Sequence, residues 1–283
     1  MSNTFIPLND GSSLPKYGCS IFRRSSVAET QAIVDKALKA GIRHFELCEL
    51  FGNAQIILDQ IYSCQISREE IYITYRLWPK GRLPGDLLAA FKEQLEYAGL
   101  TNVDLLVIHT TLDTETFVEQ YKALEATVEM GLTRSLGVSN AVYNQLVELL
   151  KNCQVQPVVF EVEVSPYRAY HNTIDFCADN GIVILASESQ NKGLRHDDEK
   201  LVGIANSLRM STSDILTRWI LAKGFAVLYS PESSSDFAPQ EEFQLDRDEG
   251  NWVMLPSDIM EVLHTFDEDL RTTWVPIKEG EAE

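Results

Sequence analysis

The sequence predicts an α/β protein whose eight parallel strands close into a (β/α)8 TIM barrel behind an N-terminal β-hairpin. From about residue 15 onward, short β-branched runs alternate with amphipathic stretches, and no Gly-rich linker interrupts them. Eight runs in this rhythm fit the barrel, while a doubly wound open sheet is the rival arrangement. We therefore expect one domain over residues 1–283, ending in an acidic tail at about 277–283.

Each expected strand is short and is followed by a stretch long enough for a helix. A hairpin should precede them over residues 5–15, because Asp10-Gly11 tolerates the positive φ of a tight turn. The expected strands are Lys16–Ser20, Arg43–Leu47, Ile71–Arg76, Val103–His109, Arg134–Val138, Val158–Glu163, Ile182–Ala186 and Phe225–Tyr229.

Helix starts are also predicted from the residue spacing. Ser26 and Ser67 each stand three residues before a glutamate, the spacing of a capping box. Between residues 85 and 99 the apolar side chains fall on one helical face, with the charged ones away from it. We expect this helix to lie outside the barrel with its apolar face inward.

The charge of the chain excludes some partners. Its 24 Lys and Arg against 42 Asp and Glu give 24 − 42 = −18, a field that repels nucleic acids and anionic membranes. Part of the acidic excess lies in Gln240–Glu249 and at the C-terminal end. This surface either keeps the protein soluble or meets a partner with a basic surface.

The chain shows no targeting or metal-binding pattern. No run approaches the roughly 18 apolar residues that a spanning helix needs, and the first residues do not resemble a signal peptide. The five cysteines form no CxxC pair, and the histidines show no metal-ligand spacing. We expect a cytoplasmic protein without a metal site, a disulfide framework or a membrane segment.

Four motifs in order resemble the aldo-keto reductase family. They are Gly41–Glu46, Arg76-Leu-Trp78, Asp104–His109 and Gly137-Val-Ser-Asn140, and the resemblance runs from about residue 5 to about residue 245. It implies hydride transfer from a nicotinamide cofactor to a carbonyl group. It further implies a tyrosine as general acid, a lysine and an aspartate that lower its proton affinity, and a histidine that orients the substrate.

Three of these four catalytic positions hold other residues. The tyrosine position is Phe51, the lysine is Arg76 and the aspartate is Glu46, whereas the histidine is kept as His109. A benzyl ring has no proton to give, and a guanidinium does not release one near neutrality. His109 could act as the acid instead. Glu46 and Arg76 are expected to form a buried ion pair across neighbouring strands.

The cofactor-binding positions differ as well. Where the family holds the nicotinamide carboxamide with an Asn-Gln pair, this chain has Phe160 and Glu161, and an ionised glutamate cannot both donate and accept. Ser187 stands where the family stacks a tyrosine on the nicotinamide. Ser139 and Asn140 are kept and either contact a nicotinamide or cap the next helix.

The segment after the eighth strand lacks the cations that grip the adenosine phosphate in the family. No Lys or Arg occurs from Phe225 to Leu245, and the matching run is Leu228–Asp236. Without a cationic clamp and in a field of −18, a phosphate should bind poorly.

Taken together, these replacements predict a non-catalytic pseudoenzyme with an aldo-keto-reductase-like barrel. We expect a structural, scaffold or regulatory subunit without a cofactor, whose protein partners carry basic or cytoskeletal surfaces. Glu46, Phe51, Arg76 and His109 would then form a vestigial pocket, and Ser139, Asn140, Glu161 and Ser187 a vestigial cofactor site. The alternatives are a carbonyl oxidoreductase with an atypical active site that uses NADPH or NADH, and a sensor of a nucleotide or metabolite.

Overall fold

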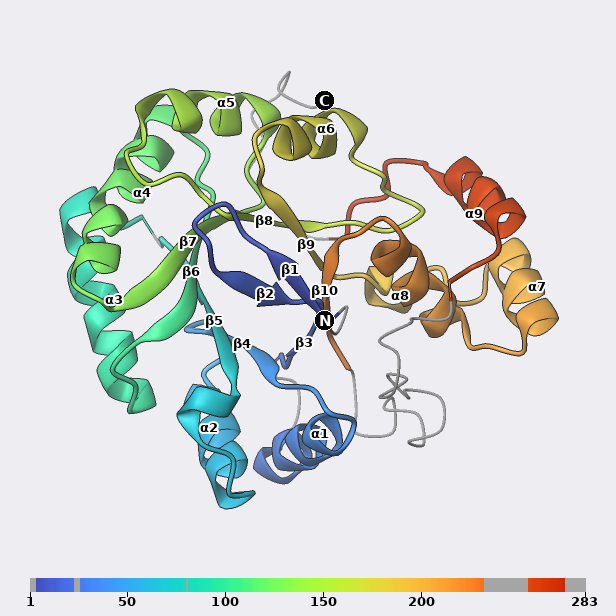
Figure 1. Ribbon diagram of the computed structural model, residues 1–283, viewed down its shortest axis with the longest axis horizontal. Helices are drawn as coiled ribbons and strands as arrows, with labels where there is room; N and C mark the ends of the chain where they lie inside the picture. The colour runs from blue at the N-terminus through green and yellow to red at the C-terminus, as the bar shows by residue number, and fades with distance from the viewer. Residues whose placement is uncertain (1–3, 23–25, 80, 232–253, 273–283) are drawn as a thin grey trace.

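A computed structural model describes residues 4–22, 26–79, 81–231 and 254–272 (Figure 1). Eight parallel strands form a closed barrel in the order β10-β3-β4-β5-β6-β7-β8-β9. The predicted (β/α)8 barrel is therefore confirmed, and the open sheet is excluded. Each predicted strand is present, with its ends shifted by at most one residue.

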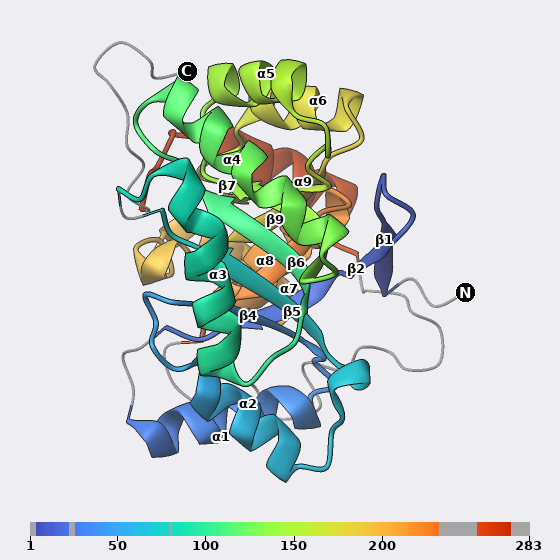
Figure 2. The same ribbon diagram turned by 90° about the vertical axis from the view of Figure 1, so that its left-hand side faces the viewer.

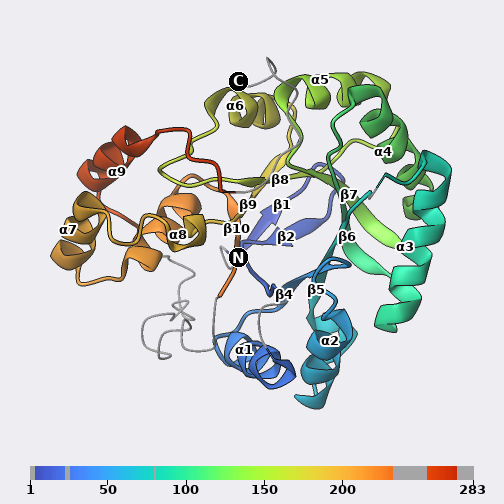
Figure 3. The same ribbon diagram turned by 180° about the vertical axis from the view of Figure 1, so that it is seen from behind.

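The strands and helices alternate along the chain, and the helices surround the barrel (Figures 2 and 3). The barrel strands are β3 (Tyr17–Ser20), β4 (His44–Cys48), β5 (Tyr72–Leu77), β6 (Val103–His109), β7 (Thr133–Ser139), β8 (Val159–Glu163), β9 (Val183–Ser187) and β10 (Ala226–Tyr229). The helices are α1 (Val27–Lys39), α2 (Ala54–Ser63), α3 (Pro84–Ala98), α4 (Thr114–Glu129), α5 (Tyr143–Asn152), α6 (His171–Asp179), α7 (Glu199–Leu208), α8 (Thr212–Ala222) and α9 (Ser257–Leu263).

The predicted hairpin is confirmed and closes one end of the barrel. Its strands β1 (Phe5–Pro7) and β2 (Ser13–Pro15) pair antiparallel, and Figure 1 shows them lying across the middle of the ring of strands. Leu14 is fully buried against apolar side chains of the barrel interior such as Leu105. Because the hairpin fills this end, the interior opens toward the carboxyl ends of the strands, where barrels of this kind carry their sites.

Both capping predictions are confirmed, and at Ser67 the backbone N–H donates to Glu70 Oε2 at 2.9 Å. Ser26 accepts a hydrogen bond from the backbone N–H of Glu29 at the start of α1, as expected. Ser67 begins only a 3-10 turn, Arg68–Glu70, because β5 starts two residues later. The predicted helix between residues 85 and 99 is α3, which turns its apolar side chains inward.

A segment after the last strand folds over the open end of the barrel. Thr272 donates its backbone N–H to both carboxylate oxygens of Glu163 on β8 at 3.0 Å. Arg168, in the loop after β8, forms an ion pair with Asp269. The C-terminal residues that the structure describes thus bind the part of the mouth built by β8 and the loop that follows it.

Several predictions stay untested by the fold. Gln240–Glu249, the acidic tail and most of the Leu228–Asp236 run lie outside the described residues. Over the ranges that the structure describes, no helix has the length and apolar character needed to cross a bilayer. That the whole chain forms one domain and resides in the cytoplasm stays a prediction.

Candidate functional site

The predicted ion pair between Glu46 and Arg76 is present and extends to a third residue. Arg76 Nε lies 3.0 Å from Glu46 Oε1, and Arg76 Nη1 lies 2.7 Å from Glu161 Oε1. The three residues come from β4, β5 and β8, so the guanidinium reaches across the barrel interior. The two carboxylates are 1% and 0% exposed. Water therefore screens little of their mutual repulsion.

One positive charge faces two carboxyl groups in this buried cluster. Burial raises the pKa of Glu161 to about 8, against the opposing effect of Arg76, and Glu46 raises it further. Burial opposes the charge on Arg76, but Glu161 and Glu46 together raise its pKa. At neutral pH the cluster therefore holds an ionised Arg76 and a protonated Glu161. A protonated carboxyl both donates and accepts, which an ionised one cannot do.

Phe51 lies beside this cluster in the loop after β4. Its ring packs against Phe22 with centroids 4.5 Å apart, and the Arg76 guanidinium lies 5.4 Å from its centroid. The buried ring offers Arg76 a cation-π contact but no proton. Phe51, at the position of the family's tyrosine, thus contacts the guanidinium of Arg76 but cannot act as a general acid.

His109 is the last residue of β6, and its imidazole ring is held by contacts with Trp78 and Ser139. Its ring stacks on Trp78 with centroids 3.8 Å apart, and its Nδ1 lies 3.4 Å from Ser139 Oγ. Its Nε2 is buried and has no hydrogen-bond partner among the described residues. Burial lowers the pKa of His109 to about 3, and Arg76 lowers it as well, so the imidazole is neutral at physiological pH.

Ser139 and Asn140 follow the end of β7 and also turn toward the cluster. Ser139 Oγ lies 3.4 Å from Glu161 Oε1. Asn140 has a left-handed backbone (φ 55), and its Nδ2 is buried with no partner in the described part of the chain. The alternative prediction that this pair caps the next helix is wrong, because α5 begins at Tyr143 and its N-cap is Val142.

The remaining predicted position and one missed residue lie on the neighbouring strands. Ser187 ends β9, is buried, and is in register with Glu163. No role was predicted for Glu163 from the sequence, although it accepts hydrogen bonds from Thr272 at the barrel mouth. Its signal in the sequence was the spacing of two glutamates, at 161 and 163, on one face of a buried strand.

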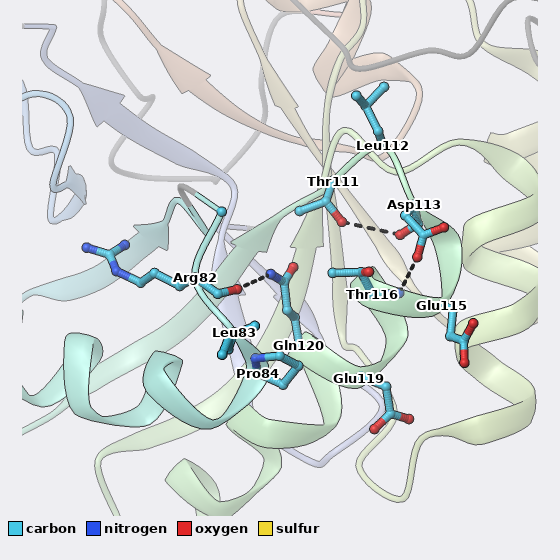
Figure 4. Close-up of a pocket in the computed structure, with 11 residues that line it drawn as sticks. Arg82, Leu83, Pro84, Thr111, Leu112, Asp113, Glu115, Thr116, Glu119 and Gln120 are labelled. Atoms are coloured by element: carbon cyan, nitrogen blue, oxygen red, sulfur yellow. Dashed lines mark hydrogen bonds between the residues drawn. The ribbon is translucent and has the colours of Figure 1, made fainter.

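A separate cavity of about 490 Å³ lies between the starts of α3 and α4 (Figure 4). It is bounded by the loop between β5 and α3 and by the start of α4. Gln120 donates to the carbonyl oxygen of Arg82 across it at 2.8 Å. None of the eight predicted site residues lines this cavity. Its wall combines apolar Leu83, Pro84 and Leu112 with acidic Asp113, Glu115 and Glu119.

Six of the eight predicted residues thus lie at the carboxyl ends of barrel strands or just after them, while Glu46 and Glu161 lie at the middle of β4 and β8. Five of them form one chain of contacts: Glu46, Arg76, Glu161, Ser139 and His109. Three buried polar atoms in this region lack a partner among the described residues: His109 Nε2, Asn140 Nδ2 and Glu161 Oε2. Buried polar groups are nearly always hydrogen-bonded, so these atoms indicate a place for a polar ligand. No group of metal-ligating side chains occurs within the described residues.

Comparison with known proteins finds relatives that are named reductases. The family model described as "Aldo/keto reductase family" matches residues 16–240. The chain is 30% identical to the 9,11-endoperoxide prostaglandin H2 reductase of Trypanosoma cruzi over 85% of both chains. It is 29% identical to the glyoxal reductase of Bacillus subtilis, covering 79% of this chain and 80% of the relative.

Solved structures share the fold. The Bombyx mori aldo-keto reductase in complex with NADP superposes with a TM-score of 0.84 at 24% identity, over 96% of this chain and 95% of that one. An aldo/keto reductase from Brucella melitensis gives a TM-score of 0.82 at 27% identity, over 93% and 99% of the two chains.

These findings correct the functional prediction. The chain was expected to be a non-catalytic pseudoenzyme acting as a scaffold, but its relatives are named reductases, and nothing supports a scaffold or cytoskeletal role. The expectation that no cofactor binds is also overturned, because the matching family model is that of the aldo/keto reductases and the relatives are named reductases. The prediction rested on the replaced tyrosine, the missing stacking ring and the missing cations after the eighth strand, and the match to named reductases outweighs these replacements. Protein partners with basic surfaces stay a prediction.

Proposed function

Because this chain belongs to the aldo/keto reductase family, we propose that it is a nicotinamide-dependent oxidoreductase that reduces a carbonyl compound with an atypical set of active-site residues. The observation that carries the proposal is the match to named reductases over most of the chain. The contacts at the barrel mouth support it, because they leave unused polar atoms where strands of the barrel end.

The unused atoms fit the polar end of a nicotinamide. Among the described residues, the donor Asn140 Nδ2 and the acceptor Glu161 Oε2 have no partner, and a carboxamide offers one oxygen and one NH₂ group to such a pair. Asn140 and Glu161 would therefore hold the carboxamide, with Ser139 between them in the hydrogen-bond network. The cofactor, when bound, supplies the hydride.

His109 is suited to bind the carbonyl group of the substrate. In the neutral tautomer with its proton on Nε2, the imidazole donates from that atom, which has no other partner in the described residues. Trp78 fixes the plane of the ring by stacking. A donor held in a water-poor site stabilises the negative charge that develops on a carbonyl oxygen as hydride adds to the carbon.

The neighbouring residues shape the electrostatics of the same site. Arg76 is held by two carboxyl groups and by the ring of Phe51, so its charge stays in the barrel interior. That charge stabilises negative charge on a substrate oxygen nearby. Together with burial, it lowers the pKa of His109 and keeps the imidazole neutral.

The proposal is tested with purified protein, NADPH or NADH, and a panel of carbonyl compounds that includes glyoxal and an aromatic aldehyde. We expect saturable quenching or enhancement of nucleotide fluorescence, and oxidation of the nucleotide only when a carbonyl compound is present. Absence of both binding and turnover with each nucleotide would contradict the proposal.

His109→Leu is the variant that tests the role of the imidazole. Losing one donor aimed at a developing oxyanion costs on the order of 10²–10³ in rate, while nucleotide binding should change little. His264→Leu is the matched control, because this histidine is exposed and lies beside α9 away from the strand ends. Equal turnover by both variants would rule out the role given to His109.

A further inference from the structure

A neutral His109 cannot supply the proton for carbonyl reduction by itself. If Nε2 gave its proton to the alkoxide and no proton replaced it, the ring would become an imidazolate anion. Such a strong base does not form at neutral pH. Nδ1 must therefore receive a proton as Nε2 releases one. The described hydrogen-bond partner of Nδ1 is Ser139 Oγ, and the next contact of that hydroxyl is Glu161.

We propose that Glu161 is the proton store of the site and that its proton reaches the carbonyl oxygen through Ser139 and His109. This inference rests on the proposed oxidoreductase function and names the proton source that Phe51 cannot provide. Glu161 and Ser139 act through His109, which is the group that touches the substrate.

Charge balance in the barrel makes Glu161 the carboxyl that keeps a proton. Two buried carboxyl groups share the single guanidinium of Arg76, so ionising both would leave one uncompensated negative charge in the interior. Glu46 accepts a hydrogen bond from the hydroxyl of Ser20 and forms an ion pair with Arg76. The described contacts of Glu161 Oε1 are Arg76 and Ser139.

The other titratable groups around Glu161 do not remove this proton. Cys48 on β4 contacts Arg76, and burial raises its pKa to about 11, so it stays a thiol at neutral pH. Glu163 lies on the same strand, but its carboxylate accepts hydrogen bonds from Thr272. Burial also raises the pKa of Glu188, after β9, and this reduces the charge next to the cluster. Glu161, with a pKa of about 8, is protonated near neutrality.

The path has two links of equal length. Ser139 Oγ lies 3.4 Å from Glu161 Oε1 and 3.4 Å from His109 Nδ1. Both distances are long for hydrogen bonds, as catalytic contacts often are before a substrate binds. A hydroxyl can accept from one neighbour while it donates to the other, so Ser139 can pass a proton without holding a charge.

The transfer balances in atoms and charge. The carbonyl carbon gains the hydride, the C=O π bond breaks, and the nicotinamide that supplied the hydride is oxidised. The oxygen takes the proton of His109 Nε2, Nδ1 takes the proton of Ser139 Oγ, and Ser139 takes the proton of Glu161. The carboxylate that remains is stabilised by Arg76 at 2.7 Å and is reprotonated from water after product release.

The test compares Glu161→Gln with Glu163→Gln. Glutamine keeps the size and hydrogen bonds of Glu161 but has no acidic proton, so we expect nucleotide binding within a few-fold of wild type and a hydride-transfer rate reduced on the order of 10²-fold. Glu163→Gln replaces an equally buried glutamate on the same strand and should retain most of the rate. Ser139→Ala interrupts the path and should resemble Glu161→Gln.

Two further measurements separate a proton store from a structural role. Wild-type turnover should fall as the pH rises through about 8, where Glu161 ionises, and this limb should be absent from the Glu161→Gln profile. The infrared spectrum of the protein without nucleotide should show the carbonyl band of a buried protonated carboxyl near pH 7 that disappears in Glu161→Gln and persists in Glu163→Gln.

The outcomes distinguish a failure of the proton relay from a failure of the oxidoreductase function. If wild type turns over but Glu161→Gln keeps the full rate and the same pH limb, the relay is wrong and the oxidoreductase function stands. If the infrared band is unaffected by Glu161→Gln, Glu161 does not hold the proton and the relay is wrong. If wild type neither binds the nucleotide nor reduces any carbonyl compound, the proposed function fails and the relay fails with it.

Discussion

Replacing Arg76 with methionine should make the stability of the protein more strongly dependent on pH. The wild-type cluster holds one buried proton, on Glu161, up to about pH 8, whereas the unfolded chain releases it near the ordinary glutamate pKa of 4.5. Without the guanidinium, two buried carboxyl groups remain with no cation between them, so the folded variant must hold one further proton over this range. Because the native state then binds more protons than the unfolded state, its stability falls as the pH rises.

The magnitude follows from proton linkage. Each additional proton held by the native state lowers the free energy of unfolding by about 1.4 kcal/mol per pH unit. Removing one partner of a buried ion pair costs about 3–5 kcal/mol when the remaining charge is uncompensated. We therefore expect Arg76→Met to lose about 3–5 kcal/mol at pH 8 and about 1 kcal/mol or less at pH 5.

Urea unfolding at pH 5 and pH 8, followed by circular dichroism, measures this difference. Arg68→Met is the control, because Arg68 pairs with Asp104 at 2.8 Å but both side chains are about a quarter exposed. A partly exposed pair contributes only about 0–1 kcal/mol, so this variant should show a small loss with little dependence on pH. An equal loss for Arg76→Met at the two pH values would refute the shared-proton cluster.

Three other changes test separate parts of the structure. A methyl group at Gly18 would lie 2.6 Å from His44 Nδ1, so Gly18→Ala should lower the stability by about 1–3 kcal/mol, and an unchanged thermal midpoint would contradict this packing. Trp78→Ala should raise the pKa of His109 from about 3 toward its ordinary value, because water then reaches the imidazole ring. An NMR titration of the variant that still gives a pKa of about 3 would exclude the role of the stack. Glu161→Gln should remove most of the wild-type loss of stability between pH 5 and pH 8, and an unchanged slope in urea unfolding would assign that proton elsewhere.

The barrel was predictable because its signals are local. Strands that are buried on both faces appear in the sequence as short apolar runs. Each such run forms a strand whose ends differ from the predicted ones by no more than one residue. The pair Glu46 and Arg76 was predictable for a similar reason, since β4 and β5 are neighbours in the chain and in the sheet.

The contact between Arg76 and Glu161 could not be found in this way. These residues are 85 positions apart and lie on strands that are not adjacent, so only closure of the barrel brings them together. The protonation of Glu161 was hidden for the same reason, because it depends on how many charges share one buried volume. Judged alone, Glu161 was taken as an ionised residue unable to replace an amide.

The functional prediction failed because each position was compared singly with the family pattern. Phe51 does remove one proton donor, and its neighbours confirm that it cannot act as an acid. His109 was named as an alternative acid, but the sequence does not give the groups that surround it. Ser139 illustrates the point, since the next helix begins beyond it and its hydroxyl lies between His109 and Glu161.

The central claim is that this chain transfers hydride to a carbonyl group although position 51 holds phenylalanine. The most direct measurement incubates the wild-type protein with a carbonyl compound and a reduced nicotinamide that carries deuterium at its transferable position, and analyses the alcohol by mass spectrometry. We expect an alcohol with one deuterium on the former carbonyl carbon, formed in proportion to the nucleotide oxidised. No deuterated alcohol from any carbonyl compound, with correctly folded protein, would contradict the account.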